Sequence, residues 1–475
     1  MTALAVVAAA VLGVAISPDA DRTVEAVGGE LGAGGEFQQI TPTRIYDSRD
    51  LGDALPMRAS ETDPTIDVQV VGEGGLDEMV DVNEDDQDDN VLAVVVNITV
   101  IEPTRLGFLR AFGTGAEEGN TSVVNFFPGT FIPNTAIIRP GDDGKISLRL
   151  ISPEGPGTAH VAVDITGWFS TSAYPANGDR MIDIDPIRVY DSELDQFGGA
   201  TLTGRSQVEV PIRGAADAPK PNTVVIPDEE DVVGVVANIT GVNVFPDSLP
   251  TYIAAVPDAV PDGEVPDTST VNLVDGQIRA NMAILPVDEN GSIHLFNLQG
   301  EVRMVVDVVA YLKSDVSPDT RAGRVVPLVA PFRALDTRED DFGDTPLGPA
   351  EAEDFSFESF IADVQIDGEP VGAQSALIGN LTATDLTPQY DWEQAASFIT
   401  AFPTPATGKA VPTVSNVNIY EGDTVPNLVV LPYGSRPTDA GDGLCEDDHC
   451  IRFYNRAGYV DYLLDVYAVI LDDDD

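Results

Sequence analysis

A short motif that places a cation near an anion occurs three times in the 475-residue chain. In each copy an arginine stands two residues after a proline, and an aspartate follows the arginine three residues later. A guanidinium and a carboxylate at this spacing can form a charge-assisted pair across a bend at the end of a strand. The same groups could instead hold a sugar or a carboxylate ligand, but we favour the structural interpretation. The pairs are Arg44 with Asp47, Arg188 with Asp191, and Arg333 with Asp336.

Other landmarks recur at the same period, which identifies an internal triplication of one module. The three arginines are 144 and 145 residues apart. Each is followed by Asn-aliphatic-Thr in an apolar run, by Ser-x-x-Asn, by an asparagine before another apolar strand, and by an aspartate between aliphatic residues. In that order the recurring residues are Asn97, Asn238 and Asn380; Ser122/Asn125, Ser269/Asn272 and Ser415/Asn418; Asn134, Asn281 and Asn427; and Asp164, Asp307 and Asp465.

The recurring aspartates and asparagines lie in apolar runs, so we expect them to be buried and hydrogen-bonded. An unpaired carboxylate in an apolar environment is costly. We therefore predict that Arg44 pairs with Asp47 or Asp164, with equivalent pairs in the other two copies. Asn97 and its two equivalents are formally N-glycosylation sequons. Their recurrence inside a strand favours buried amides that cap backbone groups over sites of glycan attachment.

Within each module, short apolar or alternating runs follow one another and are separated by turns rich in Gly and Pro. Seven or eight such runs at this spacing are typical of an antiparallel sandwich or a closed barrel. No window keeps a helical period, so we expect little helix. The predicted fold class is all-β, with three tandem antiparallel β-sandwich or barrel-like domains of about 140 residues each. In the first module the expected strands are 66–71, 91–100, 107–112, 122–127, 131–139, 146–151 and 160–169.

Three runs are apolar at successive positions, at 91–96, 232–237 and 304–309, and we expect them to be central strands that are covered on both faces. Two short charged linkers, 170–180 and 313–323, part the modules, which indicates three modules in a row with limited freedom. The assigned boundaries are residues 1–35 for a signal-like apolar segment and Gly-rich lead-in, 36–172 for module 1, 181–313 for module 2 and 324–475 for module 3.

The N-terminal stretch Leu4 to Ile16 is apolar and too short to span a bilayer. Its length and the small residues that follow are typical of a signal peptide, although a basic region before it is missing. A packed apolar strand or helix therefore stays an alternative to export. No other apolar run approaches the length of a membrane span, so we expect none in the mature chain.

The chain carries 79 acidic and 25 basic residues, which gives a formal net charge of −54. This charge repels phosphate backbones and anionic membrane surfaces, so nucleic acid is excluded as a partner. It also destabilises the fold unless salt screens it or divalent cations bind. Calcium is the one ligand that composition favours. Residues 81–89 begin like an EF-hand loop, but Asp86 stands where glycine is needed, so we expect a solvated loop and no cofactor.

The two cysteines, Cys445 and Cys450, are separated by four polar residues. This spacing fits a hairpin tip closed by a disulfide better than a metal site, for which only His449 is an obvious further ligand. The other histidines, His160 and His294, occupy no repeated position, and no serine-hydrolase or zinc-protease motif occurs. Carboxylate pairs are uninformative in so acidic a chain, which leaves a glycosidase open. Triplication argues against an enzyme, because an enzyme seldom needs three diverged copies of one site.

The combined motif order resembles a tandem module of secreted and cell-surface proteins of actinobacteria. The motifs that carry the resemblance are Pro-x-Arg-aliphatic-x-Asp-(Ser/Thr)-Arg, Asn-aliphatic-Thr, Ser-x-x-Asn and a final Val-Asp-(Ile/Val)-x-(Gly/Ala)-aromatic, and it covers residues 37 to 471. It implies an exported, surface or wall-associated protein and supplies no activity. The second copy departs from the pattern with Glu193 in place of the last arginine, and the third with Ala468-Val469 in place of Gly-aromatic. If that arginine binds a ligand, the second copy is impaired.

We therefore predict an exported, non-catalytic structural or surface-display protein, which could self-assemble through strand edges or through acidic loops joined by cations. The first alternative is a multivalent cell-wall or glycan-binding protein that combines three weak sites. Its expected aromatic residues are few, since Trp168 and Trp392 are the only tryptophans and are not equivalent. An extracellular hydrolase is the remaining alternative. The expected partners are cell-wall components or other copies of the chain, and the expected location is extracellular or at the cell surface.

Overall fold

The computed structural model describes residues 24–25, 34–50, 55–57, 65–76, 90–171, 174, 177–194, 201–217, 223–243, 245, 249–317, 319–339, 345–366, 369–390, 395–405, 411–434 and 449–473. This part of the chain is mostly β-strand. Among the described residues there is one α-helix, α1 (Glu358–Asp363), and one 3-10 turn at Asp142–Gly144. The strands pair in antiparallel fashion, except for the short pairing of β1 with β21. The predictions of an all-β antiparallel protein with little helix are confirmed.

Each module builds two sheets with the same order of strands. In module 1 the first sheet has the order β2-β10-β5-β8, with β3 also paired to β10, and the second sheet has the order β4-β9-β6-β7. The strands are β2 (Glu36–Asp47), β3 (Leu55–Met57), β4 (Ile66–Gln69), β5 (Val91–Ile101), β6 (Gly107–Gly113), β7 (Val124–Phe126), β8 (Phe131–Ile138), β9 (Lys145–Ile151) and β10 (Gly157–Ser170).

Modules 2 and 3 repeat both sheets. Module 2 has the orders β11-β18-β13-β16 and β12-β17-β14-β15, and module 3 has β19-β28-β23-β26 and β20-β27-β24-β25. The strands of module 2 are β11 (Arg180–Asp191), β12 (Ser206–Pro211), β13 (Val232–Asn243), β14 (Thr251–Val256), β15 (Val271–Leu273), β16 (Gln277–Pro286), β17 (Ser292–Asn297) and β18 (Arg303–Lys313). Those of module 3 are β19 (Val325–Asp336), β20 (Ala352–Ser356), β23 (Gln374–Thr387), β24 (Ala396–Pro403), β25 (Val417–Tyr420), β26 (Val425–Pro432), β27 (Cys450–Asn455) and β28 (Tyr459–Leu471). A small sheet joins β1 (Val24–Glu25), β21 (Val364–Ile366) and β22 (Glu369–Pro370).

The strands expected in module 1 all occur, as β4 to β10, with ends that differ by a few residues. The three runs that are apolar at successive positions lie in β5, β13 and β18, and each of these strands has a neighbour on both sides in its sheet. The prediction that they are central strands is confirmed. Every residue of β5 is buried, so the first sheet of module 1 is covered on both faces.

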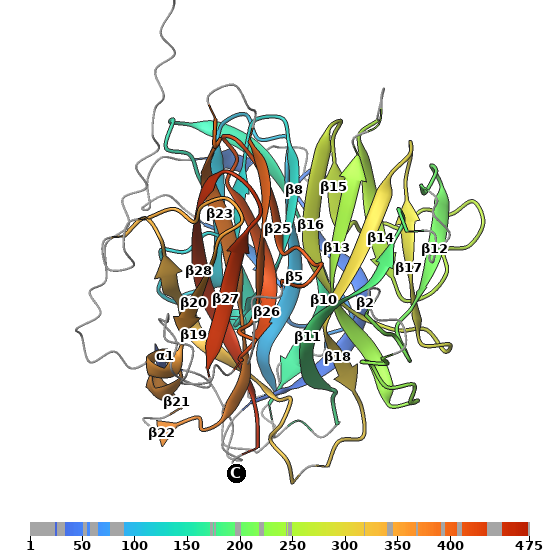
Figure 1. The fold of residues 1–475 in the computed structure, drawn as a ribbon, viewed down its shortest axis with the longest axis vertical. Coiled ribbons are helices and arrows are strands. Elements are labelled where there is room, and N and C mark those ends of the chain that lie inside the picture. Colours follow the sequence, from blue (N-terminus) through green and yellow to red (C-terminus); the bar gives the residue numbers. More distant parts are fainter. Residues whose placement is uncertain are drawn as a thin grey trace, which may run out of the picture.

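The six sheets stand around one axis like the blades of a β-propeller. Their inner edge strands form a closed circle: within the modules β7 packs beside β8, β15 beside β16 and β25 beside β26. Between the modules β8 packs beside β15, β16 beside β25 and β26 beside β7. In Figure 1, β8, β16 and β26 lie near the middle of the molecule, with the other strands of module 3 on one side and those of module 2 on the other.

The expectation of three sandwich domains in a row is therefore wrong. Its physical weakness is that the first sheets are apolar on both faces, whereas a separate sandwich covers only one face of each sheet. The second apolar face is buried against the neighbouring modules. One hydrophobic cluster accordingly combines module 1 with inner residues of the other two modules, such as Met282 and Leu428, while modules 2 and 3 each keep a further cluster of their own.

No helix in the described part of the chain is long and apolar enough to cross a membrane. The signal-like stretch from Leu4 to Ile16 lies outside the described residues, so export stays a prediction.

Candidate functional site

The recurring Arg–Asp pairs join the first and last strands of each module. Arg44 on β2 lies opposite Asp164 on β10, and its Nε and Nη2 donate to the two carboxylate oxygens at 2.8 and 3.1 Å. Two parallel hydrogen bonds from one planar guanidinium fix both the distance and the register of the strands. Arg44 thus has one of the partners that we proposed from the sequence. The equivalent distances are 2.8 and 3.1 Å for Arg188 with Asp307, and 2.5 and 3.1 Å for Arg333 with Asp465.

Each guanidinium also reaches the aspartate three residues further along the chain. The distances are 3.3 Å for Arg44 with Asp47, 3.1 Å for Arg188 with Asp191 and 2.9 Å for Arg333 with Asp336. The last arginine of the motif completes the cluster in two modules: Arg49 donates to Asp47 and Arg338 to Asp336, at 2.9 and 2.8 Å. In module 2 this position holds Glu193, which pairs with Arg303 instead.

In these clusters the aspartates and arginines neutralise one another's charge. Burial raises the pKa of Asp164, and the hydrogen bond from Arg44 opposes that effect. The hydrogen bond from Arg49 is the largest cause that lowers the pKa of Asp47. The Asp164 side chain is only 1% exposed, so its charge depends on the arginine beside it. The arrangement stabilises strand pairing and leaves little carboxylate surface for a ligand.

The recurring asparagines of the Asn-aliphatic-Thr motif join one module to the next. Each lies beside the recurring aspartate in the strand register, and each side-chain amide donates to the backbone carbonyl of a serine in the neighbouring module. These side chains are buried, which agrees with capping of backbone groups rather than with glycan attachment. The bonds run from Asn97 to Ser269 (2.8 Å), from Asn238 to Ser415 (2.6 Å) and from Asn380 to Ser122 (2.9 Å).

The second set of asparagines lies on the inner edge strands and forms hydrogen bonds across the same junctions. Asn281 on β16 donates to Asn97 Oδ1 at 2.9 Å, donates to Thr270 O at 2.8 Å, and accepts from Thr135 N at 3.1 Å. It therefore bonds twice to module 1 and once to its own module. The two equivalents repeat the pattern: Asn427 donates to Asn238 Oδ1 (2.8 Å) and accepts from Met282 N (3.1 Å), and Asn134 donates to Asn380 Oδ1 (3.0 Å) and accepts from Leu428 N (3.2 Å).

The Ser-x-x-Asn motif supports the same junctions. Asn125 donates to Ser122 Oγ at 3.2 Å, and Asn272 donates to Ser269 Oγ at 3.0 Å. The carbonyls of these serines are the ones that accept from the neighbouring module. In the third copy, the amide nitrogen of Asn418 is buried without a hydrogen-bond partner among the described residues.

A charge cluster joins the starts of the three modules. Glu36, Arg180 and Arg324 are spaced by 144 residues each, so they occupy equivalent positions. Glu36 Oε1 lies 2.9 Å from Arg180 Nη2 and 3.5 Å from Arg324 Nη2. Arg180 is 1% exposed and also donates to the carbonyls of Thr320 and Ala322. One carboxylate from module 1 thus bridges cations at the starts of modules 2 and 3.

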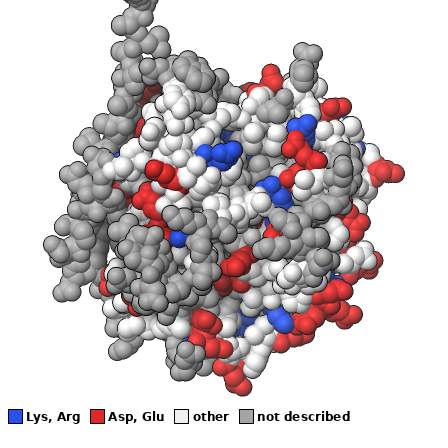
Figure 2. Space-filling view, viewed as in Figure 1, with Lys and Arg blue, Asp and Glu red and all other residues white. Residues whose placement is uncertain are grey.

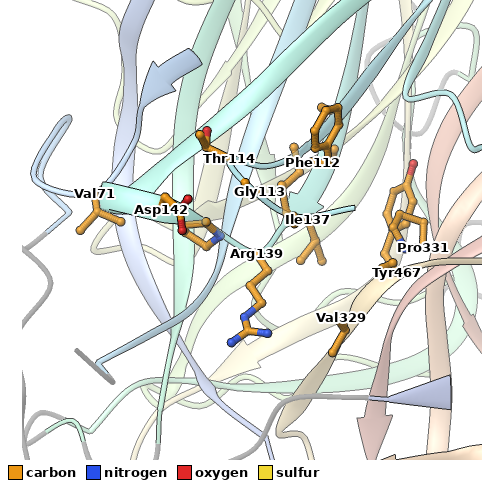
Figure 3. Close-up of a pocket in the computed structure, with 18 of the residues that line it drawn as sticks. Val71, Phe112, Gly113, Thr114, Ile137, Arg139, Asp142, Val329, Pro331 and Tyr467 are labelled. Atoms are coloured by element: carbon orange, nitrogen blue, oxygen red, sulfur yellow. The ribbon is translucent and has the colours of Figure 1, made fainter. Parts of the chain in front are cut away.

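The three junctions between modules differ in how tightly they pack. A cavity of about 1030 Å³ separates β19 of module 3 from β6 and β8 of module 1 (Figure 3), and one of about 960 Å³ separates β11 of module 2 from β24 of module 3. At the equivalent place between modules 1 and 2 the cavity is only about 30 Å³. The linings differ too, since Tyr467 lines the first cavity and Thr166 stands at the equivalent place in the smallest one. Residues that line the first cleft include Val71, Phe112, Arg139, Asp142, Val329 and Tyr467.

Arg139 and Tyr467 do not recur in the other modules, so the repeated pattern does not identify them. Arg139 is five residues after Asn134, whereas proline stands at that distance from Asn281 and from Asn427. A departure from the pattern of the repeat was therefore the available signal.

The remaining predicted groups form no second site in the described residues. Cys450 is buried at the start of β27, but Cys445 lies outside the described residues, so the disulfide stays a prediction. Residues 81–89 lie outside them too. Elsewhere in the described ranges, no group of three or more His, Cys, Asp or Glu residues could hold a metal ion. Each histidine has a local partner: His160 contacts Ser48, His294 contacts Asp288, and His449 contacts Glu358.

No protein-family model matches the chain, and no curated protein matches it. Among solved structures, the CBM22-1-CBM22-2 tandem domain from Paenibacillus barcinonensis Xyn10C is 10% identical and covers 63% of this chain and 100% of its own, with a TM-score of 0.16. A triple-jelly-roll turret protein of an archaeal virus is 8% identical, with coverages of 91% and 90% and a TM-score of 0.16. A chain of Sulfolobus Turreted Icosahedral Virus is 8% identical, with coverages of 93% and 92% and a TM-score of 0.16. At these TM-scores the likenesses carry no argument about this chain.

The Arg–Asp pairs generate a stability prediction. Arg44→Met should lower the free energy of unfolding by about 3 kcal/mol, because it leaves the buried Asp164 carboxylate without its partner. The double variant Arg44→Met/Asp164→Leu should recover much of that loss, since neither charge then remains buried. Urea unfolding of the three proteins measures both effects. A neutral single variant would show that the pair does not hold the strands.

The junction amides generate a second prediction. Asn281→Ala should destabilise the protein by about 2–4 kcal/mol, because it orphans Thr135 N and Asn97 Oδ1 in a buried junction. Asn134→Ala and Asn427→Ala should have similar effects, since their contacts are equivalent. Asn272→Ala, which removes one bond within module 2, is the matched control and should cost about 1 kcal/mol. Thermal unfolding of the four variants tests this, and a neutral result at any of the three junctions would contradict the account.

Asp179 generates a prediction for pH. Burial raises the pKa of Asp179 to about 6, against the hydrogen bond from Gln39. A carboxylate whose pKa is higher in the folded state stabilises the protein fully below its unfolded pKa, near 3.8, and loses that contribution as the pH rises through about 6. Asp179→Asn should therefore gain stability over the natural protein between about pH 4 and pH 6, by about 1–2 kcal/mol after allowance for partial exposure. Unfolding in urea across this range measures the difference, and a difference independent of pH would refute it.

Proposed function

We propose that this chain is a non-catalytic structural protein, displayed outside the cell or on its surface, in which three modules form one rigid body. The observation that carries the proposal is where the recurring polar residues lie. The arginines and aspartates join strands within a module, and the asparagines join the modules. The polar residues that recur in all three modules therefore stabilise the ring.

The same observation weighs against a multivalent binder with three equal sites. Such a protein would keep its ligand-binding residues in all copies, on accessible surface. Here the recurring side chains are largely buried, and the clefts between modules differ in volume and in lining.

The surface charge favours a setting with salt or divalent cations. Figure 2 shows Asp and Glu side chains along the right and lower edges and in patches within the visible face, with Lys and Arg at scattered positions. At a net charge of −54, copies of the chain repel one another unless the charge is screened or bridged. We infer that divalent cations, which bridge carboxylates as well as screening their charge, drive the assembly of copies. The resemblance of the repeated motif to a module of secreted actinobacterial proteins supports the proposed location.

Fractionation of the cells that produce the protein tests the location. The account predicts recovery from the envelope or the medium, and labelling of intact cells by an antibody raised against the folded chain. Recovery only from the cytosol would refute the proposed display role.

Static light scattering tests the proposed assembly. Calcium should produce large particles that chelation dissolves, whereas sodium chloride at matched ionic strength should not, because it screens charge without bridging it. A persistent monomer under calcium would remove self-assembly from the account and leave the single-body display role.

A further inference from the structure

The linker before each of modules 2 and 3 is hydrogen-bonded to the first strand of the preceding module. Asp179, in the linker before module 2, exchanges two backbone hydrogen bonds of 2.8 Å with Phe37 on β2. In the linker before module 3, Gly323 O accepts from Met181 N on β11 at 2.9 Å. These contacts cover the outer edge of each strand near its start, where backbone groups would otherwise be unpaired.

The N-terminal lead-in makes the third contact of this kind. Gly35 exchanges two backbone hydrogen bonds with Val325 on β19, at 2.8 and 3.0 Å. The contact is equivalent to the other two, because Gly35 stands 144 residues before Asp179 and Val325 stands 144 residues after Met181. Linkers join module 1 to module 2 and module 2 to module 3, whereas modules 3 and 1 are neighbours in the ring that no linker joins. The lead-in thus bonds to the first strand of module 3 as a linker does at the other two junctions.

The packing around this part of the lead-in leaves room only for glycine. A Cβ atom added to Gly35 would lie 2.3 Å from Ser170 O and 2.7 Å from Leu92 Cδ1, both in module 1. Gly34 has a φ of +85°, and a Cβ atom there would lie 2.8 Å from Arg324 Cβ in module 3. Both glycines are buried. The backbone of the lead-in therefore fits closely between modules 1 and 3.

The side chain of Glu36 holds the same point. Its Oε1 lies 3.5 Å from Nη2 of Arg324, which immediately precedes Val325, and 2.9 Å from Nη2 of Arg180. Backbone and side-chain contacts from neighbouring residues thus meet the start of β19 together. Further along β19, the junction between modules 3 and 1 opens into the cavity of about 1030 Å³. The contacts of the lead-in are therefore made at a junction that is loosely packed elsewhere.

We propose that residues 34–36 form a strap that closes the ring between modules 3 and 1. At the other two junctions a continuous linker keeps the modules together, and the strap has this role where a linker is missing. The end of the lead-in is therefore a working part of the fold, and the mature protein retains it from Gly34 onward. The proposal depends neither on the location of the protein nor on the assembly of copies.

Hydrogen exchange of backbone amides in the full chain tests the strap. Val325 N donates to Gly35 O, and Met181 N makes the equivalent bond at the junction between modules 2 and 3. Gly35→Ala displaces the strap, so the peptide that contains Val325 should exchange about tenfold faster or more, the factor that corresponds to loss of one hydrogen bond. The peptide that contains Met181 should exchange as in the natural protein, because its junction is unchanged. Mass spectrometry of the two peptides measures both rates.

Gly119→Ala is the matched control, because a Cβ atom added there meets no other atom closer than 3.9 Å. It should leave the exchange of both peptides unchanged. Unchanged exchange at Val325 in Gly35→Ala would overturn the proposal, since the strap would then not hold the junction. Equal acceleration at Val325 and Met181 would overturn it too, because the substitution would then act on the whole fold rather than on one junction.

The N-terminus of the natural protein gives a second test without mutation. Mass spectrometry of the intact protein, recovered from the cells that produce it, identifies the first residue of the mature chain. We expect that residue to be Gly34 or one before it, whatever leader is removed. A mature chain that begins after Gly34 would lack part of the strap and would overturn the proposal.

Discussion

Buried amide groups that find partners only in a neighbouring module hold this molecule in one piece. Each junction places two asparagines in an apolar centre, where an unsatisfied polar group costs about 1–3 kcal/mol. The partners of Asn97, Asn238 and Asn380 all belong to the next module around the axis. Opening one junction therefore leaves buried polar groups without hydrogen-bond partners, and it also exposes apolar surface. Burial of apolar side chains stabilises the contact between modules. The hydrogen bonds of the amides fix the position of each module relative to its neighbour.

The Arg–Asp pairs matter because they fix the strands on which these amides lie. Asp164 faces Asn97 across the β10–β5 ladder and faces Arg44 across the β10–β2 ladder. In module 2 the connection is direct, since Asp307 also accepts from the backbone of Ser415 in module 3, at 3.3 Å. The polar residues that recur in the sequence are thus parts of one connected arrangement that repeats three times around the axis.

The local structure of the modules could be predicted from the sequence, because apolar and alternating runs indicate the strands, and the recurring Arg and Asp positions mark the first and last strands of each module. The closed ring could not, although one clue was present. The run that became β5 is apolar at successive positions, which requires cover on both faces, but the pattern does not say whether that cover comes from the same module or from another. The contact from Asn97 to Ser269 links residues far apart in the chain, and a pattern within one module carries no information about it.

Two residues that line the cleft between modules 1 and 3 were missed for the opposite reason. Arg139 and Tyr467 do not recur, and a search for repetition passes over them. In a triplicated chain, polar residues that recur are explained by construction of the fold, whereas an isolated departure such as Arg139 needs a separate explanation. In module 2, Glu193 stands where the motif has an arginine, and it pairs with Arg303.

Differential scanning calorimetry of the full chain tests the closed ring most directly. If the modules depend on one another, the chain unfolds in one transition whose calorimetric enthalpy equals its van't Hoff enthalpy. Three resolved transitions, or a calorimetric enthalpy about three times the van't Hoff value, would mean that the modules unfold independently and would contradict the account.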